Sequence, residues 1–292
     1  MSYRMCKLPF GTSKVEKLFD IDTDLIITHF LYVEGFGFLF LFRDSHCIGY
    51  IDGSNKFYMP WMGVVGVAGN NNTSVPTFEY PSSVCYMRNM KFCYLLEKGG
   101  SRIRRLDLGR HYVDPVLGES ENYNLNSYFS KCSNRNLSET HCDADEYGNL
   151  YWSVRDLHRC FRMDSEFSTI SNYVGNGRSN FGTSNNLSSY SLSHPRGVKC
   201  INKSLYIADC GNHCLREIIG RSVKIVLGHP LKSDLSSPSQ IKYSNRIIYI
   251  KNDNQIHYIA LNDKSNGVIY SSSNIDAIDV NSKRDLLILE RT

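Results

Sequence analysis

Pairs of short apolar runs recur along this chain at a nearly constant offset, and this regularity limits the fold more than any single motif does. Six runs of strand length, rich in aromatic and β-branched side chains, lie at residues 38–42, 92–97, 150–154, 205–209, 247–251 and 286–290. A second run begins about nine or ten residues after the start of each of the first five, at 47–52, 102–107, 159–164, 214–219 and 256–261. Two such runs joined by a few turn residues predict an antiparallel hairpin.

Two further runs complete the repeat. One precedes a hairpin, at 82–87, 139–145, 196–201, 239–243 and 275–280, and another contains or ends in glycine and follows the hairpin, at 64–70, 114–119, 171–177 and 223–229. No segment shows a convincing helical period. Four short strands in every 40 to 55 residues, approximately, are typical of one blade of a β-propeller.

The two ends of the chain together supply the sixth blade. The last repeat stops after its second strand, whereas residues 3–8 and 15–20 are strand-like and belong to no other repeat. We expect these segments to be the third and fourth strands of that blade, so that no strand edge stays unpaired. The sequence therefore predicts an all-β, six-bladed β-propeller of four-stranded antiparallel blades, forming a single domain over residues 1–292. The expected blades are approximately 24–70, 82–119, 139–177, 196–229, 239–273, and 275–292 plus 1–21.

The fourth repeat, LSHPRGVKCINKSLYIADCGNHCLREI at 192–218, resembles an NHL repeat. The matching positions are Pro195, Gly197 and Val198 at the start, Leu205 to Asp209 in the strand, and Asn212 with His213 in the turn that names the family. Cys214 stands where that family usually has Arg. The segment VVGVAGN at 64–70 is similar to the family's glycine-containing strand, and the third repeat is also similar to the YWTD propellers of lipoprotein receptors. The first, fifth and sixth repeats depart from the motif, so the resemblance covers the whole chain in period and about half of it in motif.

Residues 205–218 place an Asp, a His and two Cys close together, which could indicate a metal site. The repeat favours a structural interpretation, because Asp209 ends one strand and Asn212 with His213 begins the turn into the next. Asp and Asn side chains there can accept the backbone N–H groups that a tight turn leaves unpaired. We therefore interpret Asp209, Asn212 and His213 as turn residues, with metal ligation as the alternative.

The net charge of +4 is too small to indicate nucleic-acid binding unless the cations gather on one face. The ten cysteines form no Cys-x-x-Cys pair, and no apolar stretch suits a secretory signal or a membrane span. We therefore expect a cytoplasmic protein with mostly free, buried thiols, or an extracellular one if the chain is a trimmed piece. Cys85 and Cys93 are expected nearly opposite each other on one hairpin, as the first pair to bridge under oxidation.

The sequence predicts no catalytic residue, no metal ligand and no cofactor. It contains no Gly-x-Ser-x-Gly elbow, dinucleotide-binding glycine motif or P-loop in a suitable setting. HCDADEYGN at 141–149 departs from the calcium-loop spacing and is interpreted as a hairpin turn. Some six-bladed propellers are enzymes with metals at a central channel, and the carboxylates considered for such a site are Asp143, Asp276 and Asp279.

The function predicted from the sequence is a non-catalytic NHL-type scaffold that binds a protein partner through its loops. The predicted binding residues are His46, Lys98, Arg102, Arg155, His158, Arg178, His213 and Asn254, with Arg102, Arg155 and Arg178 sharing one positively charged surface. The basic stretch 101–111 is interpreted as a solvated strand edge, with RNA binding as an alternative. A channel-centred, metal-dependent lactonase or lyase is the second alternative. The domain is expected to be monomeric and not inserted in a membrane.

Overall fold

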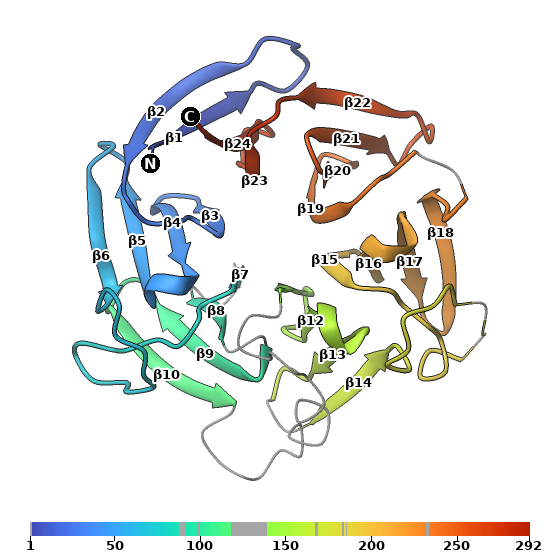
Figure 1. Ribbon diagram of the computed structural model, residues 1–292, viewed down its shortest axis with the longest axis horizontal. Helices are drawn as coiled ribbons and strands as arrows, with labels where there is room; N and C mark the ends of the chain where they lie inside the picture. Colours follow the sequence, from blue (N-terminus) through green and yellow to red (C-terminus); the bar gives the residue numbers. More distant parts are fainter. Residues whose placement is uncertain are drawn as a thin grey trace. The chain divides into compact units, whose positions relative to one another are not determined.

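The computed structural model describes residues 2–87, 92–97, 100–117, 139–166, 169–182, 184, 186–231 and 234–292. Their strands form six four-stranded antiparallel sheets, the blades of a six-bladed β-propeller (Figure 1). Blade 1 contains β3 (His29–Val33), β4 (Gly37–Phe42), β5 (Cys47–Asp52) and β6 (Phe57–Gly63). Blade 2 contains β7 (Ser83–Met87), β8 (Phe92–Glu97), β9 (Arg102–Asp107) and β10 (Tyr112–Leu117). Blade 3 contains β11 (Thr140–Ala144), β12 (Leu150–Val154), β13 (Arg159–Met163) and β14 (Ile170–Val174).

The other three blades follow the same plan. Blade 4 contains β15 (Pro195–Ile201), β16 (Ser204–Asp209), β17 (Cys214–Ile219) and β18 (Ser222–Gly228). Blade 5 contains β19 (Pro238–Ser244), β20 (Ile247–Asn252), β21 (Gln255–Ala260) and β22 (Asn266–Ser271). Blade 6 contains β23 (Ile275–Val280), β24 (Leu286–Arg291), β1 (Ser2–Leu8) and β2 (Glu16–Asp22).

The predicted closure of the last blade is confirmed. β1 pairs with β24 over six residue pairs, from Tyr3 with Arg291 to Leu8 with Leu286, and with β2 on its other side. Figure 1 shows the two ends of the chain meeting in this sheet. Tyr3 is fully buried and its hydroxyl accepts a hydrogen bond from the Ile27 amide, which ties β1 to the entry of blade 1.

Hydrophobicity decides how deeply each strand lies. The second strands are the most apolar, and all six residues of β4 and of β8 are buried. The fourth strands are much more exposed, and β18 has no buried residue. The chain divides into two compact units, Met1–Pro81 with Lys242–Thr292 and Ser82–Ile241, and each contains its own apolar core.

Two local predictions are wrong. The fourth strand of blade 1 is β6 (Phe57–Gly63) rather than 64–70, because Gly66 adopts a positive φ in a turn directly after β6. Cys85 and Cys93 are not opposite each other, since Cys85 pairs with Tyr94 and Cys93 with Tyr86. Neighbouring positions along a strand point to opposite faces, so these two thiols lie on different sides of the hairpin.

The nine cysteines within the described residues are free, and seven of them are buried; Cys132 lies outside the described residues. Among the helices that the structure describes, none has the length and apolarity to cross a membrane.

Candidate functional site

Three blades share one turn between their second and third strands. A single 3-10 turn, at Arg43–Ser45, Arg155–Leu157 or Cys210–Asn212, is followed in each case by a histidine in the left-handed conformation. These histidines are His46, His158 and His213, with φ of 58°, 52° and 53°. Among residues other than glycine, Asn, Asp and His enter this region most readily, so the turn itself favours histidine.

Each turn histidine also contacts the segment that leads into the next blade. The contacts join His46 Nδ1 to the Tyr80 amide at 3.2 Å, His158 Nδ1 to the His194 amide at 3.1 Å, and His213 Nδ1 to the Ser236 carbonyl. Two of these partners add a ring contact, with centroids 4.6 Å apart for His46 and Tyr80 and 4.5 Å apart for His158 and His194. The primary role of the turn histidines is therefore to hold the connection between neighbouring blades.

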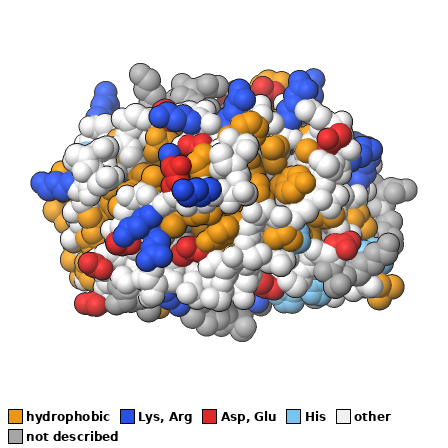
Figure 2. Space-filling view, turned by 90° about the horizontal axis from the view of Figure 1, so that it is seen from above, with side chains coloured by type: hydrophobic (Ala, Val, Ile, Leu, Met, Phe, Trp, Pro, Cys, Tyr) orange, Lys and Arg blue, Asp and Glu red, His pale blue; other side chains and the backbone are white. Residues whose placement is uncertain are grey.

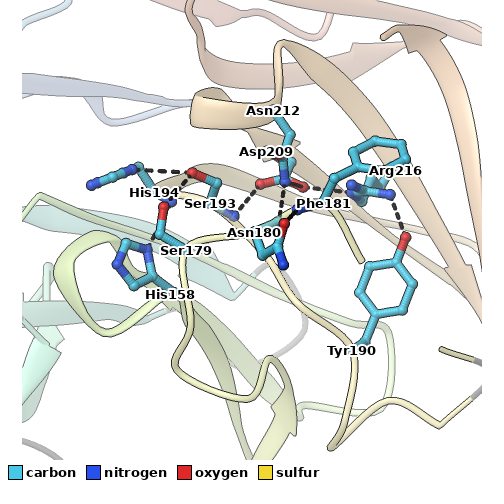
Figure 3. A network of polar contacts seen from close by, with 10 residues as sticks. All are labelled: His158, Ser179, Asn180, Phe181, Tyr190, Ser193, His194, Asp209, Asn212 and Arg216. Carbon is cyan, nitrogen blue, oxygen red and sulfur yellow. Dashed lines mark hydrogen bonds and ion pairs between the residues drawn. The ribbon is translucent and has the colours of Figure 1, made fainter. Parts of the chain in front are cut away.

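The contact between blades 3 and 4 differs because both of its rings are imidazoles. His158 and His194 meet at an interplanar angle of 90°, and both are partly exposed. His194 Nδ1 lies 3.2 Å from Ser193 Oγ, and Ser193 Oγ lies 2.9 Å from Ser179 Oγ. Two imidazoles and two hydroxyls thus gather where the loop after β14 meets the start of β15 (Figure 3).

A buried carboxylate fixes the position of Ser193. Asp209 Oδ1 accepts the Ser193 amide at 2.7 Å, and its Oδ2 accepts from Asn212 Nδ2 at 2.8 Å and Arg216 Nε at 2.5 Å. Figure 3 shows Asp209 at the centre of this network. Burial raises the pKa of Asp209, and the Arg216 cation opposes that rise. The two side chains therefore have a structural role, but Asp209 accepts an amide from outside the turn and Asn212 acts as a donor.

Arg216 is fully buried and completes the network. Its guanidinium carbon lies 4.8 Å from the Phe181 ring centroid and 5.0 Å from that of Tyr190, whose hydroxyl accepts a hydrogen bond from Arg216. The Phe181 ring in turn contacts His229. A cation between two ring faces is a favourable arrangement.

The ion pair is a feature of the blade rather than of the site. Asp209 is the last residue of β16 and Arg216 the third of β17, and Glu97 with Arg104 occupies the same two places in blade 2, also fully buried. Blade 3 has Val154 and Phe161 there. The carboxylate–Arg pair therefore stabilises the hairpin. The side chains available for acid–base chemistry are the two imidazoles and two hydroxyls of His158, His194, Ser179 and Ser193.

The electrostatic environment favours a neutral His158. Burial and the nearby His194 ring lower the pKa of His158. Because its Nδ1 accepts the His194 amide proton, the neutral ring must carry its own proton on Nε2. His158 can thus donate a hydrogen bond while uncharged, and His194 is the residue whose Nε2 can serve as a base.

The predicted binding residues differ in burial and belong to both compact units of the chain. Arg102 is only 5% exposed, so its guanidinium does not contribute to an exposed basic surface. Arg155 is half-buried in the turn before His158, Arg178 is exposed after β14, and Asn254 lies in the turn between β20 and β21. Lys98 lies outside the described residues.

The basic stretch 101–111 is not a solvated strand edge either. Arg104 is buried against Glu97 at 2.7 Å, and Arg105 pairs with Asp114. On the face drawn in Figure 2, Lys and Arg are interspersed with Asp and Glu instead of forming a uniform basic surface. The RNA-binding alternative gains no support from these residues.

The carboxylates considered for a metal site already have protein partners. Asp143 binds Lys199 at 3.0 Å, Asp279 binds Lys242 at 3.0 Å, and Asp276 binds Arg291. Within the described residues, no three His, Cys, Asp or Glu side chains are grouped so that they could hold a metal ion. These three carboxylates, each paired with a lysine or an arginine, do not fit a metal site.

Sequence reasoning did not identify His194, Ser193 or Ser179 as site residues. His194 directly precedes the Pro195 that matches the NHL pattern, which is the one sequence signal that could have marked it, and the structure shows it in the left-handed conformation with a φ of 48°. The predicted hairpin at 141–149 is confirmed, with Asp145 accepting the amides of Tyr147 and Asn149 in the turn.

No protein-family model and no curated protein sequence matches the chain. Among solved structures, the fold is similar to a catalytically inactive variant of virginiamycin B lyase from Staphylococcus aureus with quinupristin (TM-score 0.59, 10% identity, covering 99% of this chain and 100% of that one). It is also similar to a gluconolactonase from Xanthomonas campestris (TM-score 0.59, 9% identity, 87% and 82% covered) and to a chain of a nidogen–laminin complex (TM-score 0.62, 9% identity, 99% and 98% covered). Identities this low establish the propeller fold alone, and the NHL family is not confirmed by a family model.

Lyases and gluconolactonases recur among these similar folds, which contradicts the prediction of a non-catalytic scaffold and of a protein that is not an enzyme. That prediction relied on the absence of a contiguous catalytic motif. In a propeller, acid–base groups come from loops of different blades, so no such motif needs to exist in the sequence.

Proposed function

We propose that this protein is an enzyme of the lyase or lactonase type, with His194 as its base and His158 as a neutral hydrogen-bond donor. The observation that carries the proposal is the perpendicular pair of partly exposed imidazoles, 4.5 Å between centroids, at the junction of blades 3 and 4. The lyases and gluconolactonases of similar fold support the reaction class. Elimination and ester hydrolysis both need a base that is effective near neutral pH, which histidine supplies.

His194 would move the proton. With its Nδ1–H donated to Ser193 Oγ, the Nε2 lone pair takes a proton either from the carbon next to a carbonyl or from a water that attacks the carbonyl. The C–O bond of the substrate then breaks, and the imidazolium returns its proton to the leaving oxygen. Ser193 and the Asp209 carboxylate beneath it orient the His194 ring and do not react.

His158 would stabilise the developing oxyanion. Its lowered pKa keeps the ring uncharged, so Nε2–H donates a hydrogen bond without giving the proton away. A preorganised donor of this kind typically contributes about a hundredfold or more to the rate.

We further propose that the propeller is of the NHL type. The support is the repeated turn of blades 1, 3 and 4, in which a left-handed histidine closes a 3-10 turn at the position of His213 in the NHL-like repeat. The nidogen–laminin chain of similar fold is compatible with this assignment.

The test is ring opening of two cyclic esters, quinupristin and glucono-1,5-lactone, followed by mass spectrometry against the uncatalysed rate. Hydrolysis yields a product heavier by one water, whereas elimination yields an isomer of unchanged mass, so the readout separates the two reaction types. We expect His194→Asn and His158→Asn to lower kcat/KM by about a hundredfold or more, and Asn tolerates the left-handed backbone at both positions. At position 194 Asn is no base, and at position 158 its shorter side chain cannot place a donor where Nε2 of the histidine lies.

His213→Asn is the matched control, since it makes the same change in the same type of turn where no second imidazole is present. Its activity should stay near that of the unmodified protein. Failure of the unmodified protein to open either ester would overturn the reaction class. Full activity in His194→Asn would overturn the assigned site.

A further inference from the structure

A pocket of about 460 Å³ opens between blades 6 and 1, within the unit that contains both ends of the chain. One wall comes from β1, β2, β24 and the loop 281–285, and the other comes from β3, β4, the turn 34–37 and the turn after β5. This volume suits a small molecule. The pocket shares no residue with the histidine site, so the inference below does not depend on the proposed function.

Aromatic rings line the interior of this pocket. Phe38 is 9% exposed and contacts Phe19 edge-on at 5.3 Å and Tyr32 at 5.0 Å between centroids. Phe36 lies half-buried on the same wall. Ring faces of this kind bind the apolar body of a ligand and also attract an organic cation.

The charged side chains that remain available to a ligand have opposite signs on the two walls. Blade 6 contributes Lys7, Lys283 and Asp285. Lys7 is already held by Glu16 at 3.1 Å, and the buried Asp285 carboxylate accepts hydrogen bonds from the Phe10 amide and from Asn281 Nδ2. Blade 1 contributes Glu34 and Asp52, and Asp52 accepts hydrogen bonds from its own turn: the Ser54 hydroxyl, which most lowers its pKa, and the Ser54 and Lys56 amides.

Lys283 and Glu34 are the charges left for a ligand. Both are exposed, and neither makes an ion pair with any of the residues that the structure describes. The Tyr32 hydroxyl, at the same wall, is hydrogen-bonded to Glu34, and burial together with this carboxylate raises the pKa of Tyr32.

We propose that this pocket binds a small zwitterion with an apolar body, of the size of an aromatic amino acid. Its ammonium group lies against Glu34 and the aromatic rings, its carboxylate against Lys283, and its apolar part against Phe19 and Phe38. A ligand with both charges matches both walls at once, whereas a ligand with one charge leaves the other wall unsatisfied.

The test uses three probes in calorimetric titrations of the full chain: L-phenylalanine, L-phenylalanine amide, which lacks the carboxylate, and N-acetyl-L-phenylalanine, which lacks the ammonium. L-Phenylalanine should bind more tightly than either derivative, because exposed charge pairs each change affinity by about two- to fivefold. Glu34→Gln should weaken L-phenylalanine and its amide but not the acetyl derivative. Lys283→Gln should weaken L-phenylalanine and the acetyl derivative but not the amide.

Lys203→Gln, an exposed lysine in blade 4, is the matched control and should leave all three affinities unchanged. The proposal is overturned if L-phenylalanine does not bind at concentrations up to about 10 mM. It is equally overturned if the three probes bind alike, which would indicate an apolar pocket only, or if neither variant changes the affinity for L-phenylalanine.

Discussion

The buried pair of Asp209 and Arg216 illustrates how single residues stabilise a blade. Both side chains are fully desolvated, and Asp209 also accepts the Ser193 amide. Because blade 3 has Val154 and Phe161 at the corresponding places, a blade does not require an ion pair there. Once the pair is present, however, each charge depends on the other for its compensation.

Replacing Arg216 by Met should therefore destabilise the protein by about 3–5 kcal/mol, since it leaves the Asp209 carboxylate buried without its cation. Urea denaturation followed by circular dichroism measures the change. Arg221→Met, at an exposed position in the turn after β17, should change stability by less than about 0.5 kcal/mol. A loss of under about 1 kcal/mol for Arg216→Met would mean that water reaches Asp209 in solution.

A glycine at the end of the fourth strand packs against the turn histidine in blades 1, 3 and 4. A Cβ placed on Gly63, Gly175 or Gly228 would lie 2.9, 2.3 and 2.2 Å from the carbonyl oxygens of His46, His158 and His213, respectively. Each glycine also has a positive φ, of 91°, 111° and 81°. This close approach explains the glycine in the predicted runs 171–177 and 223–229.

Gly228→Ala should accordingly destabilise the fold by more than about 2 kcal/mol, because the new Cβ meets backbone that cannot move freely. The matched control is Gly220→Ala, where φ is also positive, at 59°, but no atom lies within 4 Å of the added Cβ. That variant should lose only about 1 kcal/mol, the cost of the left-handed backbone. Equal melting temperatures for the two variants would show that the contact with the His213 carbonyl does not matter.

The turn after β6 shows why one strand was predicted at the wrong residues. The glycines of 64–70 matched the pattern of the other fourth runs, but Gly66 serves a turn and Gly63 is the glycine that meets the turn histidine. Pro60 in the observed β6 weakens the strand signal, although an outermost strand tolerates proline. Composition alone does not distinguish the two glycines, because the difference lies in what each one contacts.

At the scale of the whole molecule, the pairing of the two chain ends completes the sheet of blade 6. Deleting residues 1–22 removes β1 and β2, exposes the edge of β24 and takes Tyr3, Met5 and Leu8 out of the core. We expect an insoluble protein or a melting temperature lowered by more than 10 °C, roughly, since three buried side chains of this size together contribute several kcal/mol.

A synthetic peptide of residues 1–22 should restore solubility when added in trans during refolding, because it supplies both missing strands. If the shortened chain melts like the full one without the peptide, β1 is not part of the folded sheet.

The sequence by itself determined the propeller: its repeat period, the hairpin offset, and the use of residues 3–20 to complete the last blade. These features are readable because each strand is a short apolar run bounded by turn residues, and each strand carries that local pattern in its own residues. The turn at 209–213 was readable because its backbone hydrogen bond and the contact between Asn212 and Asp209 are local.

Only the tertiary structure decided what the side chains do. His158 and His194 are far apart in sequence, and their contact depends on the junction of two blades, which no local pattern encodes. Arg102 and Arg104 look like surface cations in sequence, yet both are buried, and Arg104 lies against Glu97 of the neighbouring strand. The pocket beside Phe38 likewise combines β1, β3 and the loop 281–285, so its charges meet only after blade 6 closes on the beginning of the chain.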